Sequence, residues 1–204
     1  MIRVENIAVT GWEAAIRGMR NPMNSWDRSD TDFFFDGSTP LIGPNDMKLM
    51  KQLFTGGPEH RKYLRMIHVT LDITAPLYWW KEFDTYKIGT TANSCSTMHK
   101  ITAKEFVLED FSTEHLAGSS IACMQRVVYD LNYWRRCYME HKNKECWWQL
   151  IQLLPSSYNQ RRTVDLNYEV VFRILHQRAG HKLDEWNDLV VRLGDLPYVK
   201  EIRS

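Results

Sequence analysis

Hydrophobic residues alternate with polar ones in two segments of the chain and recur at helical spacing in most of the others. The alternation over residues 1–10, and again over His68–Ile73, predicts two β-strands, because successive side chains of a strand point to opposite faces. Helical spacing follows each strand, beginning at Trp12 in the first case and after Pro76 in the second. Pro76 suits the first turn of a helix, where its missing N–H costs nothing. The pattern therefore predicts a strand followed by a helix twice in the first half of the chain.

The second half is predominantly helical by the same criterion. Between residues 121 and 138 the apolar positions recur at steps of three and four, which predicts an amphipathic helix of several turns. Its aromatic stripe favours a place in the core or in a subunit interface over a cofactor site. Shorter helices are predicted over Met47–Phe54, Lys144–Leu154 and Leu183–Leu193. Thr163 is the predicted N-cap of a further helix that carries Asn167, Val171 and Ile174.

Composition limits the function classes. The 204 residues suffice for one sizeable domain or two small ones, and the net charge of +1 provides no global field that attracts nucleic acid or an anionic membrane. No signal peptide or hydrophobic run of membrane-spanning length is present, so we expect a cytoplasmic protein. The cysteines lack CxxC spacing, which disfavours a structural zinc site and predicts reduced, buried or half-buried thiols at Cys95, Cys123, Cys137 and Cys146.

Two polar segments carry candidate chemistry. From Lys87 to Thr97 the chain is rich in Thr, Asn and Ser around Gly89, and these residues offer hydroxyl, amide and backbone donors to a ligand. Arg61, Lys62 and Arg65 follow a Gly pair and are either a phosphate contact or a solvated basic face. The aromatic run Phe33–Phe35 sits in a long polar loop, where it either packs on the domain, the interpretation we favour, or forms a lid or subunit contact.

A resemblance to a known family begins at Ala75. The run A-P-L-Y-W-W-K-E-F-D-T-Y-K-I-G-T resembles the segment of flavin-dependent thymidylate synthases in which an A-P-[IL]-[FY] helix start leads into the signature RHRxxSxNExSxR. The ungapped register places the signature positions on Thr85, Tyr86, Lys87, Thr90, Ala92, Asn93, Cys95 and Thr97. Of these residues, only Lys87 and Thr90 are conservative replacements of the family's signature residues.

The resemblance extends along most of the chain. His60 falls on the first His of the family's GHxSxxEH segment, and Met66 falls on the second. The last third resembles the family's L-P…TxNxR…LRxxxxAQxEIR, in which Asn167 falls on the helix Asn and Arg178 on the Arg that contacts the nucleotide. Either His181 or Lys182 falls on the position of a flavin-contacting His, and Glu169 and Ile151 stand at two Arg positions.

The resemblance implies a fold and an activity. The fold is α+β, a thymidylate synthase-complementing-protein-like arrangement with a small antiparallel or mixed sheet packed with long helices, and we expect it to span residues 1–204 as a single domain. The family assembles as a homotetramer with FAD and dUMP in sites shared between subunits. Its reaction is reductive methylation of the uracil C5 with methylenetetrahydrofolate and NADPH, and it needs no protein nucleophile.

The resemblance also assigns site residues to this chain, although it identifies no catalytic residue or metal ligand. The predicted nucleotide-binding residues are Arg178, Lys87, Thr90, Cys95 and Glu82. The predicted cofactor-binding residues are His60, Thr85, Tyr86, Asn93, Asn167, Arg173 and His181.

Three functions stay open on the sequence. The first is a divergent flavin-dependent enzyme that methylates dUMP or a related pyrimidine nucleotide. The second is a catalytically silent homologue that serves as a nucleotide-binding or regulatory module, which the loss of bidentate cations at Thr85, Thr97 and Ile151 favours. The third is nucleic-acid binding through Arg135, Arg136, Arg161 and Arg162, which the near-neutral net charge disfavours.

Overall fold

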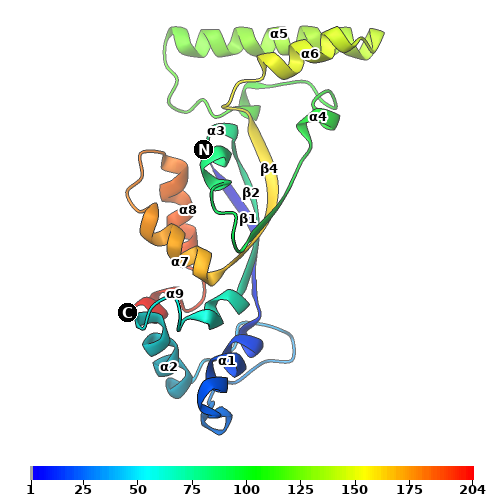
Figure 1. The fold of residues 1–204 in the computed structure, drawn as a ribbon. Coiled ribbons are helices and arrows are strands. Elements are labelled where there is room, and N and C mark those ends of the chain that lie inside the picture. The colour runs from blue at the N-terminus through cyan, green and yellow to red at the C-terminus, as the bar shows by residue number, and fades with distance from the viewer. Residues whose placement is uncertain (1) are drawn as a thin grey trace. The chain divides into compact units, whose positions relative to one another are not determined.

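The computed structural model describes residues 2–204 as a mixture of helices and strands (Figure 1). The strands are β1 (Arg3–Thr10), β2 (His68–Pro76), β3 (Thr90–Ser94) and β4 (Asn159–Asn167). The α-helices are α1 (Trp12–Arg20), α2 (Pro44–Thr55), α3 (Leu77–Phe83), α4 (Thr97–Lys100), α5 (Ser119–His141), α6 (Lys144–Leu153), α7 (Tyr168–Gln177), α8 (Asp184–Gly194) and α9 (Val199–Arg203). Short 3₁₀ turns are η1 (Asn21–Met23), η2 (Trp26–Arg28), η3 (Lys62–Met66) and η4 (Leu108–Asp110).

The strands form one antiparallel sheet in the order β1-β2-β4-β3. Together with the helices this is the α+β fold that was predicted, and both predicted strands are present as β1 and β2. The third strand, β3, lies in the polar segment after Lys87, for which the sequence predicted no strand. The fourth, β4, occupies residues for which the start of a helix was predicted.

The residues divide into two compact units. Unit 1 contains Ile73–Thr85 and Asn93–Arg162, together with the first residues up to Arg3. Unit 2 contains Val4–Asp72, Tyr86–Ala92 and Thr163–Ser204. The prediction of a single domain stays a proposal.

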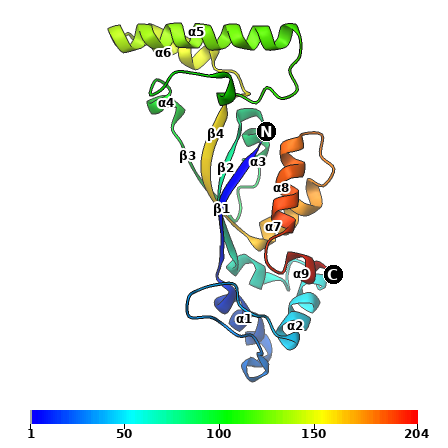
Figure 2. The same cartoon turned by 180° about the vertical axis from the view of Figure 1, so that it is seen from behind.

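In unit 1, α5 and α6 lie side by side (Figures 1 and 2) and cover a small core. This core contains the buried side chains Ile101, Phe106, Phe111, Leu131 and Leu150. The two helices are also joined by a disulfide between Cys137 and Cys146, whose Cα atoms are 6.1 Å apart. The prediction of four reduced, buried or half-buried thiols is therefore wrong. The helical hairpin brings together two cysteines that are nine residues apart in sequence, while the free Cys95 and Cys123 are exposed.

In unit 2, α7 supplies the central helix of the core. Val171, Ile174 and Leu175 are buried on it, as its apolar spacing requires. Tyr168, its first residue, is fully buried with its ring centroid 5.3 Å from that of Trp12. Trp186 of α8 is also fully buried, and α7 and α8 lie side by side in Figure 2.

The helix predicted to start at Thr163 begins four residues later. Thr163 lies in β4, where its hydroxyl donates to the Asp72 carboxylate at 2.5 Å, and the buried Val164 and Leu166 alternate with outward residues. The N-cap is Asn167, whose Oδ1 accepts from the Val170 N–H at 3.1 Å. A two-residue period over so short a run was not recognised in the sequence.

The aromatic run in the loop before α2 is exposed. Phe33 and Phe34 are 41% and 51% exposed, and Phe35 is fully exposed. The favoured interpretation, that these rings pack on the domain, is therefore wrong for Phe35. A lid or subunit contact stays a prediction.

Candidate functional site

A cluster of cationic and aromatic side chains surrounds Tyr86 in unit 2. The Tyr86 side chain is buried, and its hydroxyl donates to Gln177 Oε1 at 3.0 Å and accepts from Arg178 Nε at 3.0 Å. The guanidinium carbon of Arg173 lies 5.1 Å from the ring centroid of Tyr86. Both arginines are therefore placed within cation–π range of the same phenol, since Arg178 lies 5.6 Å from its centroid.

Helix α7 positions these groups. Arg173 and Gln177 are four residues apart on one face of the helix, and Arg178 is the C-cap residue that follows it. The Nε atom of Arg173 is buried and has no hydrogen-bond partner among residues 2–204. Because an unpaired buried donor costs about 1–3 kcal/mol, a ligand oxygen that accepts from this atom would bind favourably.

Trp186 of helix α8 and His181, which precedes this helix, both contact Arg178. The ring of Trp186 lies 4.5 Å from the Arg178 guanidinium carbon, and His181 Nε2 lies 3.3 Å from Arg178 Nη1. His181 Nδ1 also accepts from the Leu183 N–H at 3.1 Å. A neutral imidazole accepts through only one ring nitrogen and arginine has only donors, so any one neutral tautomer of His181 accepts from either Leu183 or Arg178 and not from both.

A tight turn before β3 contacts the start of α7. Gly89 has a φ of +78°, and its carbonyl accepts from the Asn167 N–H at 3.3 Å. A Cβ at position 89 would lie 2.6 Å from Asn167 Nδ2, so only glycine fits. The next residue, Thr90, has a buried hydroxyl with no partner in the described part of the chain. Lys87 lies in the same segment and is exposed.

The reversed charge at Glu169 is compensated by Arg61. Arg61 Nε lies 3.2 Å from Glu169 Oε2, an ion pair whose alignment does not meet hydrogen-bond geometry, and its guanidinium lies 5.2 Å from the Phe54 ring centroid. Arg61 is therefore already engaged by protein groups. His60, beside it, is exposed.

The structure brings six of the predicted site residues together around α7. These are Tyr86, Thr90, Asn167, Arg173, Arg178 and His181. Lys87 lies in the 86–90 segment of the same unit, and His60 neighbours the Arg61–Glu169 pair.

Four predicted residues belong to unit 1. Thr85 donates its hydroxyl to the Glu82 carbonyl at 2.7 Å, which is a local turn contact. Asn93 and Cys95 lie in and just after β3, and the Cys95 N–H donates to the Arg161 carbonyl at 2.9 Å. These four residues belong to the other unit from Tyr86, and their assigned roles stay predictions.

Two of the four arginines considered for nucleic acid are held by protein groups in unit 1. Arg162 Nη1 donates to Asp84 Oδ1 at 2.7 Å, and its guanidinium lies 4.1 Å from the Trp80 ring centroid. Arg135 Nε donates to the Thr102 carbonyl at 3.0 Å. These contacts occupy donors that a phosphate backbone would need.

Sequence analysis missed two members of the cluster. Gln177 could have been found from its spacing of four from Arg173 on the predicted helix. Trp186 carries no such signal, because its contact with Arg178 depends on how α8 packs on α7.

Comparison with solved structures identifies the fold. The chain superimposes on thymidylate synthase X from Helicobacter pylori, solved with FAD and dUMP, with a TM-score of 0.73 and 18% identity over 100% of this chain and 97% of that one. A second structure of the flavin-dependent enzyme from the same organism, complexed with FAD and dUMP, matches with a TM-score of 0.70 and 18% identity over 97% and 98% of the two chains.

A third neighbour has a different substrate description. The UMP/dUMP methylase PolB from Streptomyces cacaoi, bound with 5-Br dUMP, matches with a TM-score of 0.65 and 11% identity over 98% of this chain and 92% of that one. No protein-family model and no curated protein matches the sequence. The chain therefore has the fold of the flavin-dependent thymidylate synthases, as the resemblance predicted. None of the helices in the described residues is long and apolar enough to cross a membrane.

Proposed function

We propose that this chain binds a pyrimidine nucleotide at the Tyr86 cluster and has a thymidylate-synthase-like, nucleotide-modifying function. The observation that carries the proposal is the guanidinium of Arg178, whose Nε donates to the Tyr86 hydroxyl at 3.0 Å and whose carbon lies 4.5 Å from the Trp186 ring centroid. The fold match supports it, because its neighbours were solved with dUMP or a dUMP analogue.

The guanidinium of Arg178 suits the phosphate of the nucleotide. Guanidinium groups bind phosphate oxygens through charge-assisted hydrogen bonds, and each such bond contributes roughly 1.5–3 kcal/mol. Tyr86 holds Arg178 through its hydroxyl, and Trp186 packs against the same guanidinium, so the cation is fixed before a ligand arrives. Lys87 and the Thr90 hydroxyl are the further donors that we assign to the nucleotide.

FAD is the cofactor of the proposed reaction. The buried Nε of Arg173, which has no hydrogen-bond partner in residues 2–204, fits an anionic group such as the diphosphate of a dinucleotide. Bound FAD would supply hydride transfer, while NADPH and methylenetetrahydrofolate enter by resemblance only. By the same resemblance, the residues that we assign to the cofactor are His60, Thr85, Tyr86, Asn93, Asn167, Arg173 and His181.

A catalytically silent nucleotide-binding module is the second candidate. It is favoured by the signature positions that have lost their cations and by the local neutralisation of Glu169 by Arg61. An ion pair at that place stabilises the fold and leaves no charge there for substrate. We also propose that the chain forms a homotetramer with shared sites in the cytoplasm, by analogy with the family.

Titration with dUMP tests the nucleotide site. We expect Arg178→Ala and Lys87→Ala to weaken dUMP binding, with Arg178→Ala costing at least about ten-fold because it removes a charged donor. Arg192→Ala removes an exposed cation from α8 and is the matched control. Unchanged dUMP affinity in both test variants, with melting temperatures retained, would show that the site is assigned wrongly.

A visible absorption spectrum separates the two candidates. The purified protein is mixed with excess FAD, passed through a gel-filtration column and scanned. Flavin bands that stay with the protein support the redox function. A colourless protein that still binds dUMP would leave the silent module as the function.

A further inference from the structure

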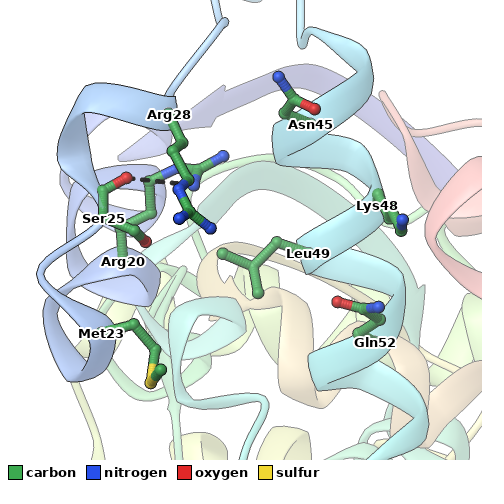
Figure 3. Close-up of a pocket in the computed structure, with 8 residues that line it drawn as sticks. All are labelled: Arg20, Met23, Ser25, Arg28, Asn45, Lys48, Leu49 and Gln52. Atoms are coloured by element: carbon green, nitrogen blue, oxygen red, sulfur yellow. Dashed lines mark hydrogen bonds between the residues drawn. The ribbon is translucent and has the colours of Figure 1, made fainter.

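A cavity in unit 2 lies between the turns that follow α1 and the helix α2 (Figure 3). Its volume is about 390 Å³, and it is built from elements other than those of the Tyr86 cluster. Its lining includes three cations and two side-chain amides, and none of its lining residues is acidic. The residues that matter for its chemistry are Arg20, Arg28, Lys48, Asn45, Gln52 and Leu49.

Arg20 is a buried cation with an unused donor. Its side chain is only 4% exposed. Its Nε donates to Asp46 Oδ1 at 2.6 Å, and its Nη1 donates to the Ser25 carbonyl at 3.2 Å. The Nη2 atom is buried and has no hydrogen-bond partner anywhere in residues 2–204. Figure 3 shows this guanidinium extending from the end of α1 toward α2.

The charge of the cavity is unbalanced. Asp46 neutralises Arg20, but its two oxygens are already occupied by hydrogen bonds from Arg20, Ser29, Asp30 and Thr31. Arg28 and Lys48 therefore add two positive charges that no lining residue cancels. In Figure 3 the guanidinium of Arg28 extends into the same space between the turns and α2. Neighbouring cations repel each other, so an anion placed between them lowers the electrostatic energy.

We propose that this cavity binds a small phosphorylated molecule. Two guanidinium groups suit the oxygens of a phosphate, with Arg20 Nη2 as the buried donor and Arg28 as the accessible one. The cavity volume lies in the range of small-molecule sites and exceeds what a phosphate ion needs. The organic part of the ligand packs against Leu49 and receives hydrogen bonds from the amides of Asn45 and Gln52.

Calorimetric titration with inorganic phosphate and with ribose 5-phosphate, in a buffer free of phosphate, tests the site. We expect ribose 5-phosphate to bind more tightly than inorganic phosphate, and both to bind more weakly at high salt. Arg28→Ala should lower both affinities by about ten-fold or more. Lys48→Ala should lower them by a smaller factor, since a lysine offers a single mobile charge.

Two variants serve as controls. Lys51→Ala removes the same charge from the same helix outside the cavity, and Arg178→Ala removes the arginine assigned to the nucleotide site. Neither variant should change the affinity for ribose 5-phosphate, whereas Arg178→Ala should weaken the binding of dUMP. The two proposed sites can therefore be tested independently of each other. The proposal is overturned if neither probe binds at millimolar concentration, or if Arg28→Ala binds both probes with the affinity of the wild type. It is also overturned if Arg178→Ala no longer binds either probe.

Discussion

At the scale of single residues, Asp46 is the most constrained charge in unit 2. Its side chain is fully buried, and its carboxylate accepts from Arg20 Nε at 2.6 Å, the Thr31 hydroxyl at 2.7 Å and the Ser29 hydroxyl at 2.8 Å. Burial alone would raise the pKa of Asp46, but the hydrogen bonds from Thr31, Ser29 and Arg20 outweigh it and lower the pKa. Asp46 is therefore ionised and ties the turn before α2 to the end of α1.

Asp46→Asn should destabilise the protein by about 3–5 kcal/mol, because it leaves the buried Arg20 without its counter-charge. A carboxylate with a lowered pKa contributes stability that is fully present above about pH 4, its unfolded pKa, and is lost as the pH falls through the folded value. Urea unfolding at pH 7 and pH 3 measures both effects. The exposed Asp188→Asn is the control, and equal midpoints for the two variants at pH 7 would contradict the prediction.

At the scale of elements, the periodicity of apolar residues identified the longer strands and helices and did not identify the short, exposed strand. The strands β1 and β2 and the helix α5 were predicted because their apolar positions repeat over at least six residues. The strand β3 was missed because its residues are mostly exposed and polar, and hydrogen bonds to β4 hold it in place. This pairing joins strands that are distant in sequence, so no local sequence pattern predicts it.

The turn at Gly89 gives a test at this scale. Gly89→Ala should destabilise by roughly 2–3 kcal/mol, because it combines strain at positive φ with displacement of the Asn167 cap of α7. Gly37 has a similar φ of +72° with no atom within 4 Å of a built Cβ, so Gly37→Ala should cost only the strain, about 1–2 kcal/mol. Thermal unfolding of both variants measures the difference. Equal losses would mean that the Asn167 contact has no energetic role.

At the scale of the whole molecule, the sequence located part of the candidate site. The register placed Tyr86, Arg173 and Arg178 at site positions and left a further position to either His181 or Lys182. The structure gathers Tyr86, Arg173, Arg178 and His181 around α7. It could not show that Arg61 is engaged by Glu169, or that Arg20 ends in a cavity with Arg28. Those relations join residues more than a hundred positions apart or depend on an irregular turn, and periodicity carries no information about either.

Two of the buried phenols in unit 2, those of Tyr63 and Tyr168, donate to backbone carbonyls. Tyr63 donates to the Met50 carbonyl at 2.9 Å and Tyr168 to the Pro197 carbonyl at 2.8 Å. Burial raises the pKa of both hydroxyls above the ordinary value. The folded state therefore holds these two protons more tightly than the unfolded state does.

This linkage predicts alkaline unfolding. The stabilisation by Tyr63 and Tyr168 is fully present below about pH 10, the unfolded pKa, and is lost as the pH rises beyond it. Spectrophotometric titration should show phenols that stay protonated past pH 10 and then titrate together with loss of helical structure. Tyr63→Phe should remove one of them, whereas the exposed Tyr129→Phe should remove only an ordinary phenol. Titration of every phenol near pH 10 in the folded protein would contradict this.

The contact between Trp186 and Arg178 has a practical consequence. The indole is fully buried, with a guanidinium 4.5 Å from its ring and His181 beside it, so its fluorescence depends on where that cation sits. An anion bound by Arg178 changes the electrostatic field at the indole without touching it. The protein thus carries an internal optical reporter next to its proposed nucleotide site, and ligands can be screened there without a label.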